Sequence, residues 1–209
     1  MHCSFGRTVA ALFTAAIASA AFASSASAGI ITTSAPSCTD GALTQPFARW
    51  NDTHQYKLVD NGAFETGTTG WALTGGAAVV SGNETYKVRS SADAKSLKLP
   101  SGSTATTPFV CVGADEPTLR LFAKRNSALL GLVSTLQVQI QVQTSLGLTA
   151  WLPVLPGDLG GSSWHPTVAM PFLVNLLTLG DRTQVRFRFV PLLGSWQIDD
   201  VYVDPMMRH

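Results

Sequence analysis

The chain has 209 residues and a formal net charge of +1; 45% of its residues are apolar and only 13% are charged. This composition excludes a disordered chain, which would have fewer apolar residues, and disfavours a nucleic-acid-binding protein, which would carry a basic surplus. The scarcity of glutamate also excludes a coiled coil. The class that remains is one soluble globular domain rich in β-structure.

Residues 1–28 have the pattern of a secretory signal peptide. Arg7 supplies the positive start, an apolar run covers about residues 9–22, and Ala26-Ser27-Ala28 is a small-residue cleavage site. A retained membrane anchor is the alternative, but the run is short for the ~20 residues that a membrane-spanning helix needs. We therefore expect a secreted, extracellular protein.

Cleavage would remove Arg7 and Cys3, leaving equal numbers of acidic and basic side chains and two cysteines, Cys38 and Cys111. In an exported protein an isolated pair of cysteines predicts a disulfide bond. Such a bond would close a loop of about 74 residues and contribute roughly 4 kcal/mol in the chain-entropy model. Two buried free thiols are the alternative.

Residues 29–55 form an N-terminal arm rich in Ser, Thr and Pro at its start. Phe47 and Trp50, with Tyr56 just beyond the arm, could pack onto the domain that residues 56–209 form. The arm carries Cys38, so the predicted disulfide would tie it to that domain.

The rest of the chain reads as short strands separated by Gly, Pro and Asn turns. We predict strands at Tyr56–Val59, Ala77–Ser81, Thr85–Arg89, Ser96–Leu99, Thr106–Val112, Leu119–Lys124, Ser134–Thr144, Thr149–Val154, Thr167–Phe172, Thr183–Val190 and Trp196–Val203. One short helix within Thr118–Val133 is an alternative, because apolar residues there also recur at helical spacing.

Two of these strands alternate strictly between apolar and polar residues. In the first, Leu136, Val138, Ile140 and Val142 alternate with Gln137, Gln139, Gln141 and Gln143. In the second, Val185, Phe187 and Phe189 alternate with Gln184, Arg186 and Arg188. A period of two places one kind of side chain on each face, as in antiparallel sheets with one face in water. About ten such strands predict an all-β antiparallel sandwich or jelly roll with an irregular N-terminal arm.

Two segments carry a family resemblance. The first is Leu58-Val59-Asp60-Asn61-Gly62-Ala63-Phe64-Glu65, followed by Gly70-Trp71, and the second is Trp196-Gln197-Ile198-Asp199-Asp200-Val201-Tyr202-Val203. Together they resemble the carbohydrate-binding modules of the galactose-binding-like β-jelly-roll superfamily, which open with N-G-x-F-E and G-W and close with I-D-D-V. The resemblance spans about residues 56–205, and it extends to small exported bacterial proteins of unknown function that consist of this module alone.

The resemblance implies that the first and last strands lie side by side, with Phe64 and Val201 filling one end of the core. Glu65 would then lie close to Asp199 or Asp200, and adjacent carboxylates repel each other unless a cation or proton separates them. Members of the superfamily often hold a structural Ca²⁺ there. We therefore expect a calcium site at Glu65 and Asp200, with Asp199 as the other candidate; acids that face solvent or accept backbone hydrogen bonds are the alternative.

A sugar-binding surface needs flat aromatic faces and planar hydrogen-bonding groups. Candidate ligand-binding residues are Gln137, Gln139, Gln141, Gln143, Arg186, Arg188, Trp151 and Trp164. The alternatives are that the glutamine row is only a hydrated sheet face, or that a ligand binds at the loop ends. Trp71 and Trp196 lie within the family-like segments, so we expect them in the core.

No catalytic motif is present: the sequence has no G-x-S-x-G, H-E-x-x-H, Walker A or G-x-G-x-x-G pattern, and its histidines are scattered. We expect no enzyme, no cofactor beyond Ca²⁺, no nucleic acid, no membrane insertion after cleavage, and a monomer. The predicted function is a secreted, non-catalytic module that binds cell-wall or environmental polysaccharide. The alternative is a structural or protein-interaction module at the cell surface, using an apolar patch around Leu173–Leu179.

Overall fold

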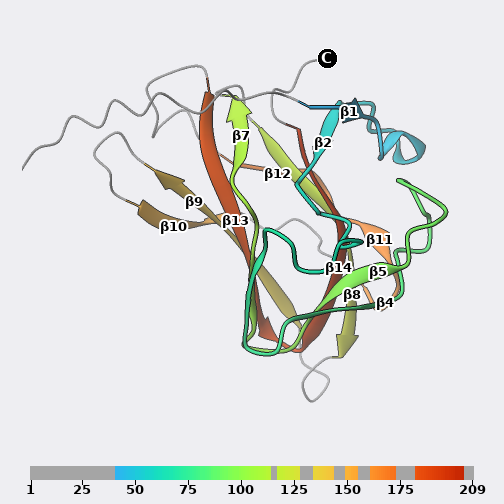
Figure 1. The fold of residues 1–209 in the computed structure, drawn as a ribbon, viewed down its shortest axis with the longest axis vertical. Helices are drawn as coiled ribbons and strands as arrows, with labels where there is room; N and C mark the ends of the chain where they lie inside the picture. Colours follow the sequence, from blue (N-terminus) through green and yellow to red (C-terminus); the bar gives the residue numbers. More distant parts are fainter. Residues whose placement is uncertain are drawn as a thin grey trace, which may run out of the picture. The chain divides into compact units, whose positions relative to one another are not determined.

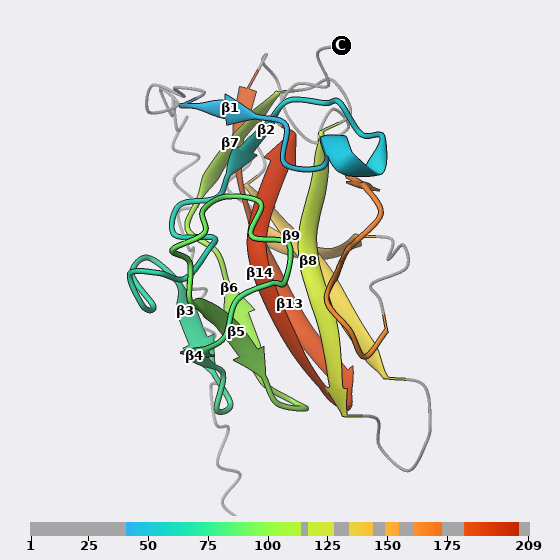
Figure 2. The same cartoon turned by 90° about the vertical axis from the view of Figure 1, so that its right-hand side faces the viewer.

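The computed structural model describes residues 41–113, 117–127, 134–143, 149–154, 161–172 and 182–204. These residues form two antiparallel sheets packed face to face, which confirms the predicted all-β sandwich. Figure 1 shows the two layers, and Figure 2 turns the strands β8 and β14 of one sheet toward the viewer. In the described part of the chain, no helix is long and apolar enough to cross a membrane.

The first sheet has eight strands. Its strands are β1 (Leu43–Thr44), β2 (Tyr56–Leu58), β4 (Ala78–Ser81), β5 (Lys95–Leu99), β8 (Thr118–Ser127), β11 (His165–Pro166), β12 (Met170–Pro171) and β14 (Ser195–Asp204). The strand β14 lies at the centre, with β8 along one side and β5 and β2 in succession along the other. The pairing of β2 with β14 confirms that the first and last strands of the domain lie side by side.

The second sheet has six strands. Its strands are β3 (Ala72–Thr74), β6 (Thr104–Thr106), β7 (Val110–Gly113), β9 (Thr135–Gln143), β10 (Thr149–Val154) and β13 (Arg182–Leu193). The strand β13 pairs with β9 along one side and with β6 and β7 along the other, while β10 extends the sheet beyond β9. The two strongly alternating sequences therefore lie next to each other as β9 and β13.

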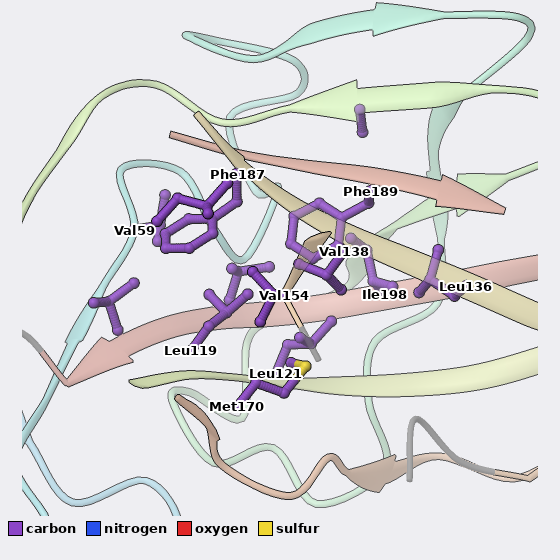
Figure 3. Close-up of a cluster of buried hydrophobic side chains, with 14 of the residues drawn as sticks. Val59, Leu119, Leu121, Leu136, Val138, Val154, Met170, Phe187, Phe189 and Ile198 are labelled. Carbon is purple, nitrogen blue, oxygen red and sulfur yellow. The ribbon is translucent and has the colours of Figure 1, made fainter. Parts of the chain in front are cut away.

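The main core lies between the sheets (Figure 3). Leu136 and Val138 from β9 and Phe187 and Phe189 from β13 are fully buried, as the alternation predicts. Leu119, Leu121 and Ile198 from the other sheet pack against the same cluster. Phe64, Trp71, Trp196 and Val201 also belong to this core, which confirms the sequence expectation for all four.

A second aromatic cluster covers the outer face of the eight-stranded sheet. Phe47 of the arm is fully buried, with ring centroids 5.0 Å from Tyr56, 5.5 Å from Phe122 and 5.6 Å from Tyr202. Trp50 lies in the 3-10 helix η1 (Ala48–Trp50) and packs against the same cluster. The arm therefore lies on the domain, as the aromatic residues predicted, and β1 and η1 give it more regular structure than expected.

Three strand predictions differ from the structure. The predicted strand Thr106–Val112 is broken into β6 and β7, and of Thr167–Phe172 only Met170–Pro171 (β12) is a strand. Residues 85–89 form a loop and not a strand. The buried Glu84 carboxylate accepts hydrogen bonds from the backbone N–H groups of Tyr86 (2.5 Å) and Val88 (2.8 Å), and these bonds take the place of strand pairing.

The predicted strand Leu119–Lys124 is confirmed as part of β8, so the alternative of a helix does not apply over Thr118–Ser127; residues 128–133 lie outside the described ranges. The outer face of β8 packs under the arm, so apolar residues occur on both faces and hide the period of two.

Three predictions fall on residues outside the described ranges: the signal peptide, the apolar patch around Leu173–Leu179, and the Cys38 end of the disulfide. The pairing of Cys38 with Cys111, which lies on β7, stays a prediction.

Candidate functional site

Polar side chains of β9 and β13 share the outer face of the six-stranded sheet. We call Gln137, Gln139, Gln141, Arg186 and Arg188 the glutamine–arginine face. They point outward because the residues that alternate with them are in the core. The strand register places Arg186 directly opposite Gln141 and Arg188 directly opposite Gln139. The two rows therefore lie side by side on one face of the sheet.

Hydrogen bonds join the two rows across the strands. Arg188 donates to Oε1 of Gln139 from Nε (2.7 Å) and from Nη2 (2.5 Å), and Arg186 donates from Nε to Oε1 of Gln141 (2.5 Å). The Nε2 amide of Gln139 in turn donates to Oε1 of Gln137 at 2.8 Å. Each guanidinium plane is thus fixed by a neutral acceptor, so little side-chain freedom remains to be lost on binding.

Aromatic rings border this face. Trp151 on β10 lies opposite Gln141 on β9. The guanidinium carbons of Arg188 and Arg186 lie 4.1 Å and 5.7 Å from the centroid of the Trp151 ring. The guanidinium carbon of Arg186 also lies 5.0 Å from the centroid of Phe109, whose side chain is 49% exposed. Rings and guanidinium groups therefore alternate on this surface in the order Phe109, Arg186, Trp151, Arg188.

The sequence did not single out Phe109. It follows Pro108 in the break between β6 and β7, inside a segment predicted as one continuous strand. A proline that interrupts an apolar run was the available signal, because proline weakens a strand assignment.

Trp164 is not part of this surface. It precedes β11 on the other sheet, is only 7% exposed, and belongs to the aromatic cluster with Phe47 and Phe122. The structure therefore separates it from Trp151, with which it was grouped. Gln143 ends β9, but its side chain lies outside the described set.

The paired acids near the end of the chain have different surroundings. The side chain of Asp199 accepts backbone hydrogen bonds from Glu84 and from Asp200, each at 2.9 Å. Burial and the neighbouring Asp200 raise the pKa of Asp199 to about 9. Both Asp199 oxygens are thus engaged within the protein, which makes it the poorer candidate for a metal ligand.

Asp200 lies at a β-bulge of β14 with a left-handed backbone (φ 46°). Its carboxylate is fully buried, and neither oxygen has a hydrogen-bond partner among the described residues. Burial, followed by the charges of Glu84, Asp93 and Glu65, raises the pKa of Asp200 to about 7, against a smaller lowering by Arg89. A buried carboxylate without a partner is costly and favours either a proton or a cation.

Other buried oxygen atoms occur in the segment of residues 83–93, whose Glu84 and Asp93 act on Asp200 through their charges. Within the described residues, Oδ2 of Asp93 and Oδ1 of Asn83 are also buried without a partner. Oxygen donors of this kind suit Ca²⁺ rather than a transition metal. In the ranges that the structure covers, however, no three Asp, Glu, His or Cys side chains converge on one point. A bound Ca²⁺ would therefore depend on Asp200 together with backbone or amide oxygens.

Glu65 is held close to this cluster. Its Oε1 accepts backbone hydrogen bonds from Ala94 and Lys95, both at 2.9 Å, and its charge contributes to the raised pKa of Asp200. Glu65 thus acts on Asp200 through its charge, while the calcium site itself stays a prediction.

The solved structures that match this chain include several carbohydrate-binding modules, the class that the sequence resembles. The N-terminal CBM22-1–GH10 modules of endo-1,4-β-D-xylanase 10B from Clostridium thermocellum, complexed with xylohexaose, match with a TM-score of 0.49 and 13% identity over 68% of this chain. The match spans only 27% of that larger protein.

Two smaller proteins are matched over most of their length. The CBM22-1 xylan-binding domain of Paenibacillus barcinonensis Xyn10C has a TM-score of 0.43 and 14% identity, over 68% of this chain and 90% of that domain. TmCBM61, in complex with β-1,4-galactotriose, has a TM-score of 0.41 and 15% identity, over 70% of this chain and 96% of that protein. No family model matches the sequence. No curated protein matches it either.

Proposed function

We propose that this protein is an exported, non-catalytic β-jelly-roll module that binds polysaccharide on the glutamine–arginine face. One observation carries the proposal: planar amide and guanidinium groups from two strands are aligned in register on one sheet face and bordered by Trp151 and Phe109. Amide and guanidinium groups hydrogen-bond sugar hydroxyls, and exposed rings stack on the apolar faces of sugars.

The two rings have different parts in this proposal. Arg188 lies over the Trp151 ring, so this indole orients a guanidinium group as well as offering apolar surface. Phe109 is the more exposed ring and is the better stacking platform. Trp164 has no part, because it is buried on the other sheet.

We further propose a structural Ca²⁺ at Asp200, with Glu65 close by. The support is the buried, unpartnered Asp200 carboxylate and the acids around it. Ca²⁺ would neutralise this charge and hold the bulge of β14 against the loop of residues 83–93, without touching the ligand.

Export and the Cys38–Cys111 disulfide complete the proposal. A disulfide would tie the arm to β7 while the aromatic cluster packs the same arm onto the opposite sheet. Intact-protein mass spectrometry after alkylation tests the disulfide. A sample that was reduced before alkylation should carry two alkyl groups, and a sample that was not reduced should carry none.

The decisive experiment for the function is affinity electrophoresis in gels that contain single plant, fungal or bacterial polysaccharides. We expect retardation by at least one of them, and a dissociation constant at least tenfold higher for the double variant Gln139→Ala, Gln141→Ala. Lys98→Ala is the matched control, because Lys98 is exposed on β5 of the other sheet. No retardation by any polysaccharide, or equal retardation of the double variant, would overturn the proposal.

A further inference from the structure

The glutamine–arginine face carries two positive charges that no acid neutralises within the described residues. Ion pairs in those parts of the chain join His54 and Arg120 to Asp52, and Arg89 to Asp93. Arg186 and Arg188 are in none of them. Both instead use neutral glutamine oxygens as partners.

Among the described residues, parts of both guanidinium groups have no hydrogen-bond partner. The hydrogen bonds of Arg186 to described residues use only Nε, and those of Arg188 use Nε and Nη2. The remaining Nη groups belong to half-buried side chains that the rings of Trp151 and Phe109 help to position. Stacked, oriented guanidinium groups are suited to bidentate contacts with planar anions.

The rest of the chain has no general excess of positive charge. The net charge is +1, and 14 basic side chains stand against 13 acidic ones. The pair of arginines is therefore a local feature of this surface. A nucleic-acid-binding surface would combine many more cations to neutralise successive phosphates.

We infer that the ligand of this face is an acidic polysaccharide whose sugars carry carboxylates, and that Arg186 and Arg188 bind those carboxylates. The two side chains are two positions apart on β13, so their backbone positions lie about 7 Å apart along one face. The oxygens of the neighbouring glutamines on β9 already accept hydrogen bonds, so their amide N–H groups are left to donate to hydroxyl groups. This inference rests on the proposed function and gives that site its class of ligand.

The test compares acidic polysaccharides with derivatives of the same backbone that lack the charge. The pairs are polygalacturonate and its methyl ester, alginate and its propylene glycol ester, and glucuronoxylan and its carboxyl-reduced form. Dextran sulfate and single-stranded DNA are included as anions without carboxylates. Binding of the full protein is measured by affinity electrophoresis and then by calorimetry.

We expect at least one acid form to bind tenfold or more tightly than its neutral partner. Its binding should weaken tenfold or more between 0.05 and 0.5 M NaCl, because the Debye length falls from about 14 Å to about 4 Å and contacts between charges are screened. Arg186→Gln and Arg188→Gln should each weaken binding of the acid form at least tenfold, while Lys98→Gln on the other sheet leaves it unchanged. Both arginine variants should change affinity for the neutral form less than threefold.

Each other result would overturn the inference. Equal binding of acid and neutral forms, with Gln139 and Gln141 still required, would leave the polysaccharide function in place and remove its acidic class. Equal or tighter binding of dextran sulfate or DNA would show attraction to charge alone. Binding of no polysaccharide would overturn both the inference and the proposed function. Circular dichroism melts show whether each variant remains folded.

Discussion

The guanidinium group of Arg188 lies over the indole ring of Trp151, with 4.1 Å between the guanidinium carbon and the ring centroid. The two residues come from strands on opposite sides of β9, so their contact spans the glutamine row. It means that the aromatic residue on the edge strand β10 controls the orientation of a cation two strands away.

Replacement of Trp151 with alanine should therefore weaken ligand binding more than it weakens the fold. We expect a dissociation constant at least tenfold higher, and a free energy of unfolding lower by only about 1 kcal/mol, because Trp151 is half-buried on an edge strand. Trp151→Phe keeps a flat ring and should retain part of the affinity. Calorimetry and urea unfolding measure the two quantities; an alanine variant that binds normally would show that Trp151 has no part in the site.

The contact between Asp52 and Arg120 should be the main polar link between the arm and the eight-stranded sheet. Asp52 accepts hydrogen bonds from Arg120 and from the Tyr56 hydroxyl (2.7 Å), and its carboxylate is largely buried. Asp52→Asn leaves the buried Arg120 without its counter-ion and should lower the free energy of unfolding by about 3 kcal/mol. Urea denaturation at pH 7 measures this; a change below 0.5 kcal/mol would contradict it.

The same carboxylate predicts a dependence of stability on pH. Burial tends to raise the pKa of Asp52, but hydrogen bonds from Tyr56, His54 and Arg120 outweigh it and lower the pKa below the ordinary 3.8. The stabilising contribution is therefore complete above pH 3.8 and disappears as the pH falls through the lower folded value. Acid unfolding should be less steep in Asp52→Asn than in the wild type, and parallel curves would refute this role.

Gly62 should tolerate no side chain. A Cβ there would lie 2.8 Å from the Val201 carbonyl oxygen and 2.9 Å from the Val59 carbonyl oxygen, where the opening segment hydrogen-bonds to β14. Gly62→Ala should lower the free energy of unfolding by roughly 2–4 kcal/mol, because backbone atoms must move apart. Gly161→Ala is the control, since nothing lies within 4 Å of its Cβ position. Thermal melts that coincide for the two variants would contradict the prediction.

Calcium should stabilise the wild type and not the Asp200→Asn variant. A ligand at a hundred times its dissociation constant adds about 2.7 kcal/mol to the free energy of unfolding. In chelator, the variant should be at least as stable as the wild type at pH 7, because it removes a buried charge near Glu84 and Asp93. Calorimetric melts with Ca²⁺ and with chelator test both statements; an unchanged wild-type midpoint would end the calcium proposal.

The pH dependence in chelator provides a second check on Asp200. Its pKa rises from 3.8 to about 7 on folding, so between these values the folded protein holds a proton that the unfolded chain has released. Stability should therefore fall as the pH rises from about 4 to 7, and less so in Asp200→Asn. Stability that rises with pH in this window, equally in both proteins, would contradict this assignment.

The sequence predicted best those strands that have one face in the core and the other in water. The strands β9 and β13 have one face in the core and one in water, so strict alternation identified both strands. Only their pairing in the structure puts Gln139 opposite Arg188. The strand β8 lacks that pattern because the arm covers its outer face: Phe122 packs there while Leu121 faces the main core. The local sequence pattern of β8 cannot show that its outer face is covered, because the covering residue, Phe47, lies 75 residues earlier in the chain.

The candidate site was predicted in part for the same reason. Alternation showed which residues of each strand are polar and outward-facing, but the register that pairs the two rows came only from the structure. The contribution of Phe109 and the exclusion of Trp164 also depend on which sheet each loop meets. Likewise, the sequence named both Asp199 and Asp200. Only the bulge of β14 decides that Asp199 receives the backbone N–H groups and that Asp200 does not.

The most direct test of the central claim is a titration of ¹⁵N-labelled protein with the best-binding oligosaccharide, followed by ¹H–¹⁵N correlation spectra. Binding on the glutamine–arginine face predicts shifts concentrated in β9, β10 and β13, with the Nε–H signals of Arg186 and Arg188 and the indole N–H of Trp151 among the largest. Shifts confined to the eight-stranded sheet or to the loop of residues 83–93, with these side-chain signals unchanged, would contradict the account.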